Sequence, residues 1–113
     1  MSRLCVTVRR DPSHTVLTLG GELDVATAEQ MTNAFTAEYE AGRRRVILDV
    51  AGLTFCDSYC LGLLLQMQDQ CARGGGCLVL VGVGGMLAQV IRMTGLERAF
   101  AQADTVERAT AEY

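Results

Sequence analysis

Asp57 and Ser58 stand where an apolar run gives way to a leucine-rich one, and their types and positions allow specific chemistry. Residues 46–50 are typical of a buried strand, and the residues after Ser58 are typical of a helix. A hydroxyl at a helix amino terminus lies among unpaired backbone N–H groups, at the positive end of the helix dipole. Two roles are therefore open to Ser58: it caps the helix, or it carries a phosphate.

A catalytic role for Ser58 would require a neighbouring base. The only histidine, His14, is far from Ser58 in sequence, and no Gly-x-Ser-x-Gly pattern surrounds the serine. The glycine-rich segments 74–76 and 82–85 lack the Gly-Lys-Ser/Thr ending of a nucleotide-binding loop, and the chain has no lysine. We therefore expect that the chain is not an enzyme and that it holds neither ATP nor another cofactor.

The cysteines do not have the spacing of a metal site. Their number is odd, no CxxC motif occurs, and His14 is the only histidine that could join them. We expect no bound metal, and we interpret the cysteines as small, buried, reduced hydrophobic residues. They are Cys5, Cys56, Cys60, Cys71 and Cys77.

Composition predicts a single domain over residues 1–113 with an aliphatic core, because 50% of the residues are hydrophobic and only 5% aromatic. No apolar run approaches the ~20 residues that span a bilayer, and the amino end lacks the apolar centre of a secretory signal. The net charge of −3 disfavours nucleic-acid binding, and we interpret Arg43, Arg44 and Arg45 as a solvated loop. We expect a cytoplasmic protein that binds neither nucleic acid nor a membrane.

Hydrophobic periodicity predicts an α/β fold with a mostly parallel four- to five-stranded sheet, an N-terminal hairpin and about four flanking helices. Gly20 and Gly21 are expected to end the second strand, and Asp24 or Thr27 to cap the first helix. The residues from 52 to Ser58 should form a loop at the carboxyl end of a central strand. The expected strands are 4–8, 16–19, 46–50, 77–81 and 99–101, and the expected helices are 28–39, 60–71, 87–94 and 106–113 after Thr105.

Five short segments, in this order and spacing, resemble the bacterial anti-sigma factor antagonists, which are members of the STAS domain superfamily. The resemblance covers residues 4–100, and it implies the STAS fold. The segments are GGELD at 20–24, LTFCDS at 53–58, LGLL at 61–64, GG at 74–75 and MTGL at 93–96.

The resemblance implies roles for individual residues. The serine directly after the aspartate is the phosphoacceptor in this family, which maps onto Ser58 after Asp57. The GGELD segment lies near the same surface, so Asp24 joins Asp57, Ser58, Tyr59 and Cys60 as an expected partner-binding residue. Tyr59 departs from the usual Ser or Thr, and Cys60 from the usual Gly. Tyr59 adds bulk that would narrow the choice of kinase, and the two departures leave open a switch that no longer takes phosphate.

The resemblance further implies partner switching by a monomer. The unphosphorylated protein would bind an anti-sigma factor with GHKL-type serine kinase activity and release a sigma factor, until phosphorylation of Ser58 ends the binding. A PP2C-type phosphatase is a further expected partner. Two alternatives stay open: a non-phosphorylated STAS adaptor subunit, in a stressosome-like scaffold or an ABC transporter, and a sensor of a small ligand.

Overall fold

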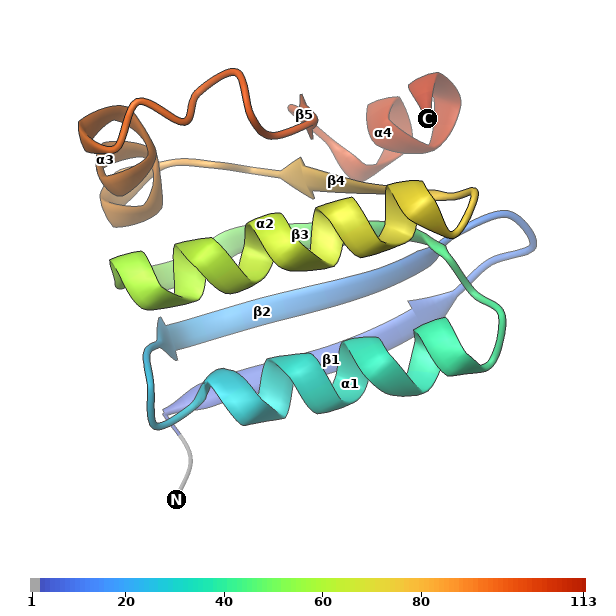
Figure 1. The fold of residues 1–113 in the computed structure, drawn as a ribbon, viewed down its shortest axis with the longest axis horizontal. Coiled ribbons are helices and arrows are strands. Elements are labelled where there is room, and N and C mark those ends of the chain that lie inside the picture. The colour runs from blue at the N-terminus through green and yellow to red at the C-terminus, as the bar shows by residue number, and fades with distance from the viewer. Residues whose placement is uncertain (1–2) are drawn as a thin grey trace.

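The computed structural model describes residues 3–113, which form one five-stranded sheet and four helices (Figure 1). Strand order in the sheet follows sequence order, β1-β2-β3-β4-β5. β1 and β2 are antiparallel, and all other neighbours are parallel, as predicted. The elements are β1 (Leu4–Arg10), β2 (Thr15–Leu23), α1 (Ala28–Glu40), β3 (Arg45–Cys56), α2 (Ser58–Arg73), β4 (Cys77–Val81), α3 (Gly85–Met93), β5 (Gln102–Ala103) and α4 (Val106–Glu112).

Helices cover both faces of the sheet. Figure 1 shows α1 and α2 in front of it, where Phe35 and Leu64 pack with Leu48 in the main hydrophobic core. Because side chains alternate along a strand, the neighbouring Ile47 faces the other layer, where it packs with Ala109 of α4. The burial of alternate residues on both faces explains why β3 and β4 begin as nearly continuous apolar runs. No helix in residues 3–113 is long and apolar enough to cross a bilayer.

The prediction that Gly20 and Gly21 end the second strand is wrong. β2 continues through both glycines to Leu23, and β3 likewise continues to Cys56 instead of forming a loop from residue 52. Gly20 pairs with Gly52, and the ladder shifts its register on both sides of Gly20–Gly21. The glycines therefore allow irregular pairing between closely spaced strands. In the sequence alone, such a glycine pair cannot be distinguished from a turn.

The prediction of an edge strand at 99–101 is also wrong. The short strand β5 lies at Gln102–Ala103 and pairs with Leu80 and Val81. The backbone just before β5 is hydrogen-bonded to the Gln68 side chain of α2. Gln68 donates to Ala99 O at 2.6 Å and accepts from Ala101 N at 2.9 Å. Phe100, between these two contacts, is buried in the main core.

A buried carboxylate ties α1 to the hairpin. Glu38 has a side chain only 5% exposed, and Arg10 donates to its two oxygens at 2.8 and 2.6 Å. These hydrogen bonds are the main reason that the pKa of Glu38 lies below its unfolded value of 4.5, with the charges of Arg10 and Arg43 adding to the effect. The ionised carboxylate therefore stabilises the fold above that value, and its contribution is lost as the pH falls through the lower, folded pKa.

We expect Glu38→Gln to lower the urea midpoint at pH 7, and the gap from wild type to shrink as the pH falls below 4.5. The reason is that the unfolded chain takes up a proton at Glu38 near pH 4.5, and the folded protein does so only at its lower pKa, below which Glu38 is neutral, as glutamine always is. Urea unfolding followed by circular dichroism from pH 7 downwards measures this. Glu40→Gln is the matched control, because Glu40 is exposed on the same helix. A gap that stays constant with pH would contradict the expectation.

Candidate partner-binding surface at the carboxyl ends of the strands

Asp57, not Ser58, caps helix α2. β3 ends at Cys56 and α2 begins at Ser58, and Asp57 between them has an extended backbone. Its Oδ1 accepts a hydrogen bond from Cys60 N at 2.8 Å. The capping role that the sequence left open for Ser58 is therefore filled by its neighbour. The Ser58 side chain is exposed on the first helical residue, and its hydroxyl makes no hydrogen bond within residues 3–113.

We expect Asp57→Ala to lower the free energy of unfolding by about 1 kcal/mol, because the Cys60 amide loses its acceptor. Ser58→Ala, one residue away, should leave stability within about 0.5 kcal/mol of wild type. Denaturant unfolding of the two variants measures the difference. Equal losses in both would show that Ser58 shares the capping role.

The register of β2 and β3 places Asp24 beside this helix start. Leu23 pairs with Cys56 at the ends of the two parallel strands, and Asp57 N donates to Leu23 O at 3.4 Å. The next residue, Asp24, therefore lies at the same edge of the sheet as the Asp57–Ser58 turn, as expected.

The Asp24 carboxylate is held by its own loop and by β1. It accepts hydrogen bonds from Ala26 N at 2.9 Å and Thr27 N at 3.1 Å, and it lies 2.7 Å from Arg3 Nη1. Asp24 therefore does not cap α1. Thr27 occupies the cap position without a side-chain cap bond, because its hydroxyl donates to Glu22 O at 2.8 Å. The sequence therefore named the right cap residue in Thr27, but neither side chain makes the expected cap hydrogen bond to α1, because the loop uses both of them internally.

Tyr59 and Cys60 have opposite environments. The Tyr59 side chain is 57% exposed, so the bulk that replaces the usual small residue lies on the surface. Cys60 is fully buried in the main core. Burial, with Asp57 as a second cause, raises the pKa of the Cys60 thiol to about 12. Cys60 therefore lies beneath the surface and supports it through the backbone contact with Asp57.

Exposed apolar side chains lie at the same end of the sheet as Ser58. Val25, Tyr59 and Met86 are 69%, 57% and 38% exposed, and they follow the ends of β2, β3 and β4. Because the carboxyl ends of parallel strands meet at one edge, these side chains belong to one end of the molecule. The sequence analysis did not single out Val25 and Met86, because neither directly follows a predicted strand end and only the tertiary structure shows that they are exposed. We call Asp24, Val25, Asp57, Ser58, Tyr59 and Met86 the carboxyl-edge surface. Exposed apolar side chains at one end of the molecule make this surface the candidate for burial by a partner protein.

The cysteines differ in exposure, which corrects the expectation that all five are buried. Cys5 is exposed on β1, and Cys77 is intermediate. The other three are buried, and burial is the main cause that raises the pKa of their thiols to about 12. They are Cys56, Cys60 and Cys71. No group of three or more potential metal ligands occurs among residues 3–113.

We expect one thiol, that of Cys5, to react rapidly with a disulfide reagent such as DTNB in the native protein. The thiolate is the nucleophile, so buried thiols of raised pKa should react only when the protein unfolds. Thiol release in native buffer and in denaturant measures this. Cys5→Ser should remove the rapid phase, and its persistence in that variant would contradict the assignment.

Comparison with known proteins gives a consistent result. A family described as "Mlab, STAS domain" matches residues 6–106. BtrV of Bordetella bronchiseptica, a candidate anti-sigma factor antagonist, is 30% identical over 95 residues, which are 84% of this chain and 82% of that protein. The anti-sigma-B factor antagonist of Staphylococcus aureus is 27% identical over 79 residues, which are 70% and 73% of the two chains.

Solved structures share the fold described above. An anti-sigma factor antagonist from Mycobacterium paratuberculosis superposes with a TM-score of 0.84 at 22% identity, over 96% of this chain and 92% of the other. Unphosphorylated SpoIIAA, also an anti-sigma factor antagonist, has a TM-score of 0.76 at 25% identity, over 94% and 93%. These likenesses confirm the predicted fold and the resemblance found in the sequence. The chain belongs to the STAS domain family, and the relatives it matches by sequence are named as anti-sigma factor antagonists.

Proposed function

We propose that this chain is an anti-sigma factor antagonist that binds its anti-sigma factor through the carboxyl-edge surface and is switched off by phosphorylation of Ser58. The observation that carries the proposal is the exposed, unbonded Ser58 hydroxyl on the first residue of α2. A capping serine would have its oxygen engaged, but Asp57 has taken that role. The names of the relatives from Bordetella bronchiseptica and Staphylococcus aureus support the same function.

The position of Ser58 explains how a phosphate would act. A phosphoserine adds about −1.5 to −2 charges, which the amino terminus of α2 tolerates within the protein. The same group would share the carboxyl-edge surface with Val25, Tyr59 and Met86, which are the exposed apolar groups that a partner would bury. Burying a dianion against an apolar contact is costly, so the partner loses affinity while the fold is kept.

The proposed partner is an anti-sigma factor with GHKL-type serine kinase activity in the cytoplasm, and a PP2C-type phosphatase would restore the serine. In this scheme the chain performs no catalytic step of its own. Tyr59 lies next to the acceptor and is largely exposed, so a kinase that accepts this chain must accommodate its ring. Tyr59 is therefore the residue that would restrict the choice of kinase.

Incubation with a candidate anti-sigma kinase and ATP, followed by peptide mass spectrometry, tests the proposal. We expect one phosphate on the peptide that contains Ser58 in wild type, and none in Ser58→Ala. Ser13→Ala is the matched control, because Ser13 is also exposed but lies at the opposite end of the sheet. Phosphate at another residue, or none with a kinase that binds the protein, would refute phosphorylation of Ser58.

A second candidate is a STAS adaptor whose binding does not depend on phosphate. The matching family carries the description "Mlab, STAS domain" and not that of a sigma-factor regulator, which favours keeping this candidate. An adaptor in a stressosome-like scaffold or beside an ABC transporter would bind its partner equally well as Ser58→Ala and Ser58→Asp. An antagonist of the proposed kind would bind its partner normally as Ser58→Ala and weakly as Ser58→Asp.

A further inference from the structure

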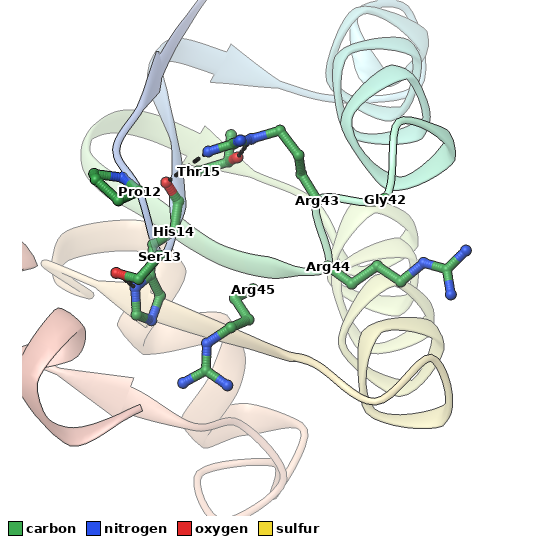
Figure 2. Close-up of a pocket in the computed structure, with 8 residues that line it drawn as sticks. All are labelled: Pro12, Ser13, His14, Thr15, Gly42, Arg43, Arg44 and Arg45. Carbon is green, nitrogen blue, oxygen red and sulfur yellow. Dashed lines mark hydrogen bonds between the residues drawn. The ribbon is translucent and has the colours of Figure 1, made fainter.

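A cavity of about 140 Å³ lies at the end of the sheet opposite to Ser58. It is bounded by the hairpin between β1 and β2 and by the loop between α1 and β3 (Figure 2). This volume is well below the ~300–1,000 Å³ of sites for drug-sized ligands, so only a small group fits. Its lining residues are Pro12, Ser13, His14, Thr15, Gly42, Arg43, Arg44 and Arg45.

Two of the three arginines at the cavity are already engaged. Arg43 donates to Thr15 Oγ1 at 2.6 Å and to Asp11 O at 2.8 Å, so it is not the solvated residue that the sequence suggested. The guanidinium of Arg44 stacks 4.4 Å from the centre of the Tyr39 ring. Figure 2 shows that Arg44 extends away from the hairpin, whereas Arg43 reaches into it.

Arg45 is the arginine whose charge is free for a ligand. Its side chain is exposed, and it has no hydrogen bond or ion pair within residues 3–113. The nearby carboxylates are occupied elsewhere: Asp11 accepts from the amides of Ser13 and His14, and Glu38 is bound by Arg10. The charge of Arg45 is therefore uncompensated at the rim of the cavity.

His14 lies at the cavity with one ring nitrogen unpaired within residues 3–113. The residue is 3% exposed, and its Nδ1 lies 2.8 Å from Ser13 Oγ. Its other ring nitrogen, Nε2, is buried without a hydrogen-bond partner in the part of the chain that the structure describes. Native proteins rarely leave such a group unpaired, because its lost hydration is not repaid.

His14 and Arg45 lie on the same face of the sheet. Thr15 pairs with Val46 in parallel strands, so the residues just before them, His14 and Arg45, lie opposite each other. Both therefore face the same layer. Figure 2 shows the imidazole of His14 and the side chain of Arg45 extending in the same direction, away from the side chain of Arg43. The cavity thus combines one free guanidinium, one hydroxyl and one buried imidazole.

We propose that this cavity binds a small tetrahedral oxyanion of the phosphate class, with Arg45 as its charged donor, Ser13 as a further polar contact, and the buried imidazole of His14 beside them. Guanidinium groups donate two parallel hydrogen bonds to such anions, which makes arginine the usual residue for them. The site is separate from the carboxyl-edge surface and does not depend on the function proposed for it. Inorganic phosphate and a simple phosphate ester present the same chemistry.

Proton NMR of the purified protein tests the proposal directly, because the imidazole signals of its only histidine report on the cavity without further assignment. Inorganic phosphate is titrated in at fixed pH and constant ionic strength, with chloride as the reference anion. We expect a saturable shift of the His14 signals that chloride does not produce. A parallel titration with glycerol 3-phosphate shows by the tighter affinity whether free phosphate or an ester is the better ligand.

Arg45→Gln should weaken phosphate binding at least about tenfold, because it removes a charge-assisted donor. Its side chain is exposed, so the fold is kept. Arg44→Gln is the matched control: it removes the same charge one residue away and should change the affinity by no more than about twofold. Equal losses in the two variants, or shifts that chloride reproduces, would overturn the proposal, because the effect would then be one of general charge.

Discussion

Ser58→Asp should weaken the binding of the anti-sigma factor by about a hundredfold, which corresponds to ~3 kcal/mol. The substitution places a permanent negative charge on the first residue of α2, where the Ser58 side chain is exposed. A partner that buries Val25, Tyr59 and Met86 must desolvate that carboxylate without a cation to pair it, and this penalty accounts for the loss. Isothermal titration calorimetry with the purified anti-sigma factor measures the dissociation constant.

Two controls separate this effect from simpler causes. Ser58→Ala should bind within about twofold of wild type, because it changes neither charge nor fold at the surface. Ser13→Asp adds the same charge at the opposite end of the sheet and should also bind normally. Tight binding by Ser58→Asp would contradict the charge mechanism, and weak binding by Ser13→Asp would show that net charge alone is responsible.

Gly21→Ala should destabilise the protein by about 3 kcal/mol, the combined effect of backbone strain and a steric clash. Gly21 has a φ of +103°, which residues with a β-carbon rarely adopt. A β-carbon there would also collide with the backbone carbonyl of Arg3, which already accepts a hydrogen bond from Glu22 N at 3.0 Å. Denaturant unfolding followed by circular dichroism measures the loss.

The neighbouring glycine is the matched control. Gly20 has no positive φ, and a β-carbon built on it meets nothing within 4 Å. Gly20→Ala should therefore change the free energy of unfolding by less than about 1 kcal/mol. Similar losses in both variants would mean that the strand as a whole, and not the conformation of Gly21, excludes alanine. A displaced Arg3 would also weaken the ion pair that holds Asp24 at the carboxyl-edge surface.

Local patterns in the sequence predicted several elements well. The β4 strand has the predicted bounds, Cys77–Val81, because a continuous apolar run between glycines allows few alternatives. Thr105 caps α4 as expected, with its side chain accepting from Arg108 N. α2 follows its apolar stripe, and Cys60, Leu64, Met67 and Cys71 are buried on it.

Elements whose backbone is determined by a distant partner were predicted poorly. Gly20 and Gly21 were interpreted as a turn because their sequence suits one, yet they pair with Gly52 and Leu53 across the sheet. The short strand β5 was placed too early because the Gln68 contacts, 31 and 33 residues away in sequence, determine where pairing begins. Glu38 of α1 shows the same limitation, since its buried position depends on Arg10 of β1.

Residue type and spacing alone determined that Asp57 and Ser58 stand between an apolar strand and a leucine-rich helix, since both patterns are local. Tertiary structure alone decided which of them caps the helix, because that depends on the extended backbone of Asp57 and its distance to Cys60 N. The parallel pairing of β2 with β3 likewise decided that Asp24 lies beside them. Such neighbours come from hydrogen bonds between segments far apart in the chain, which a linear pattern does not record.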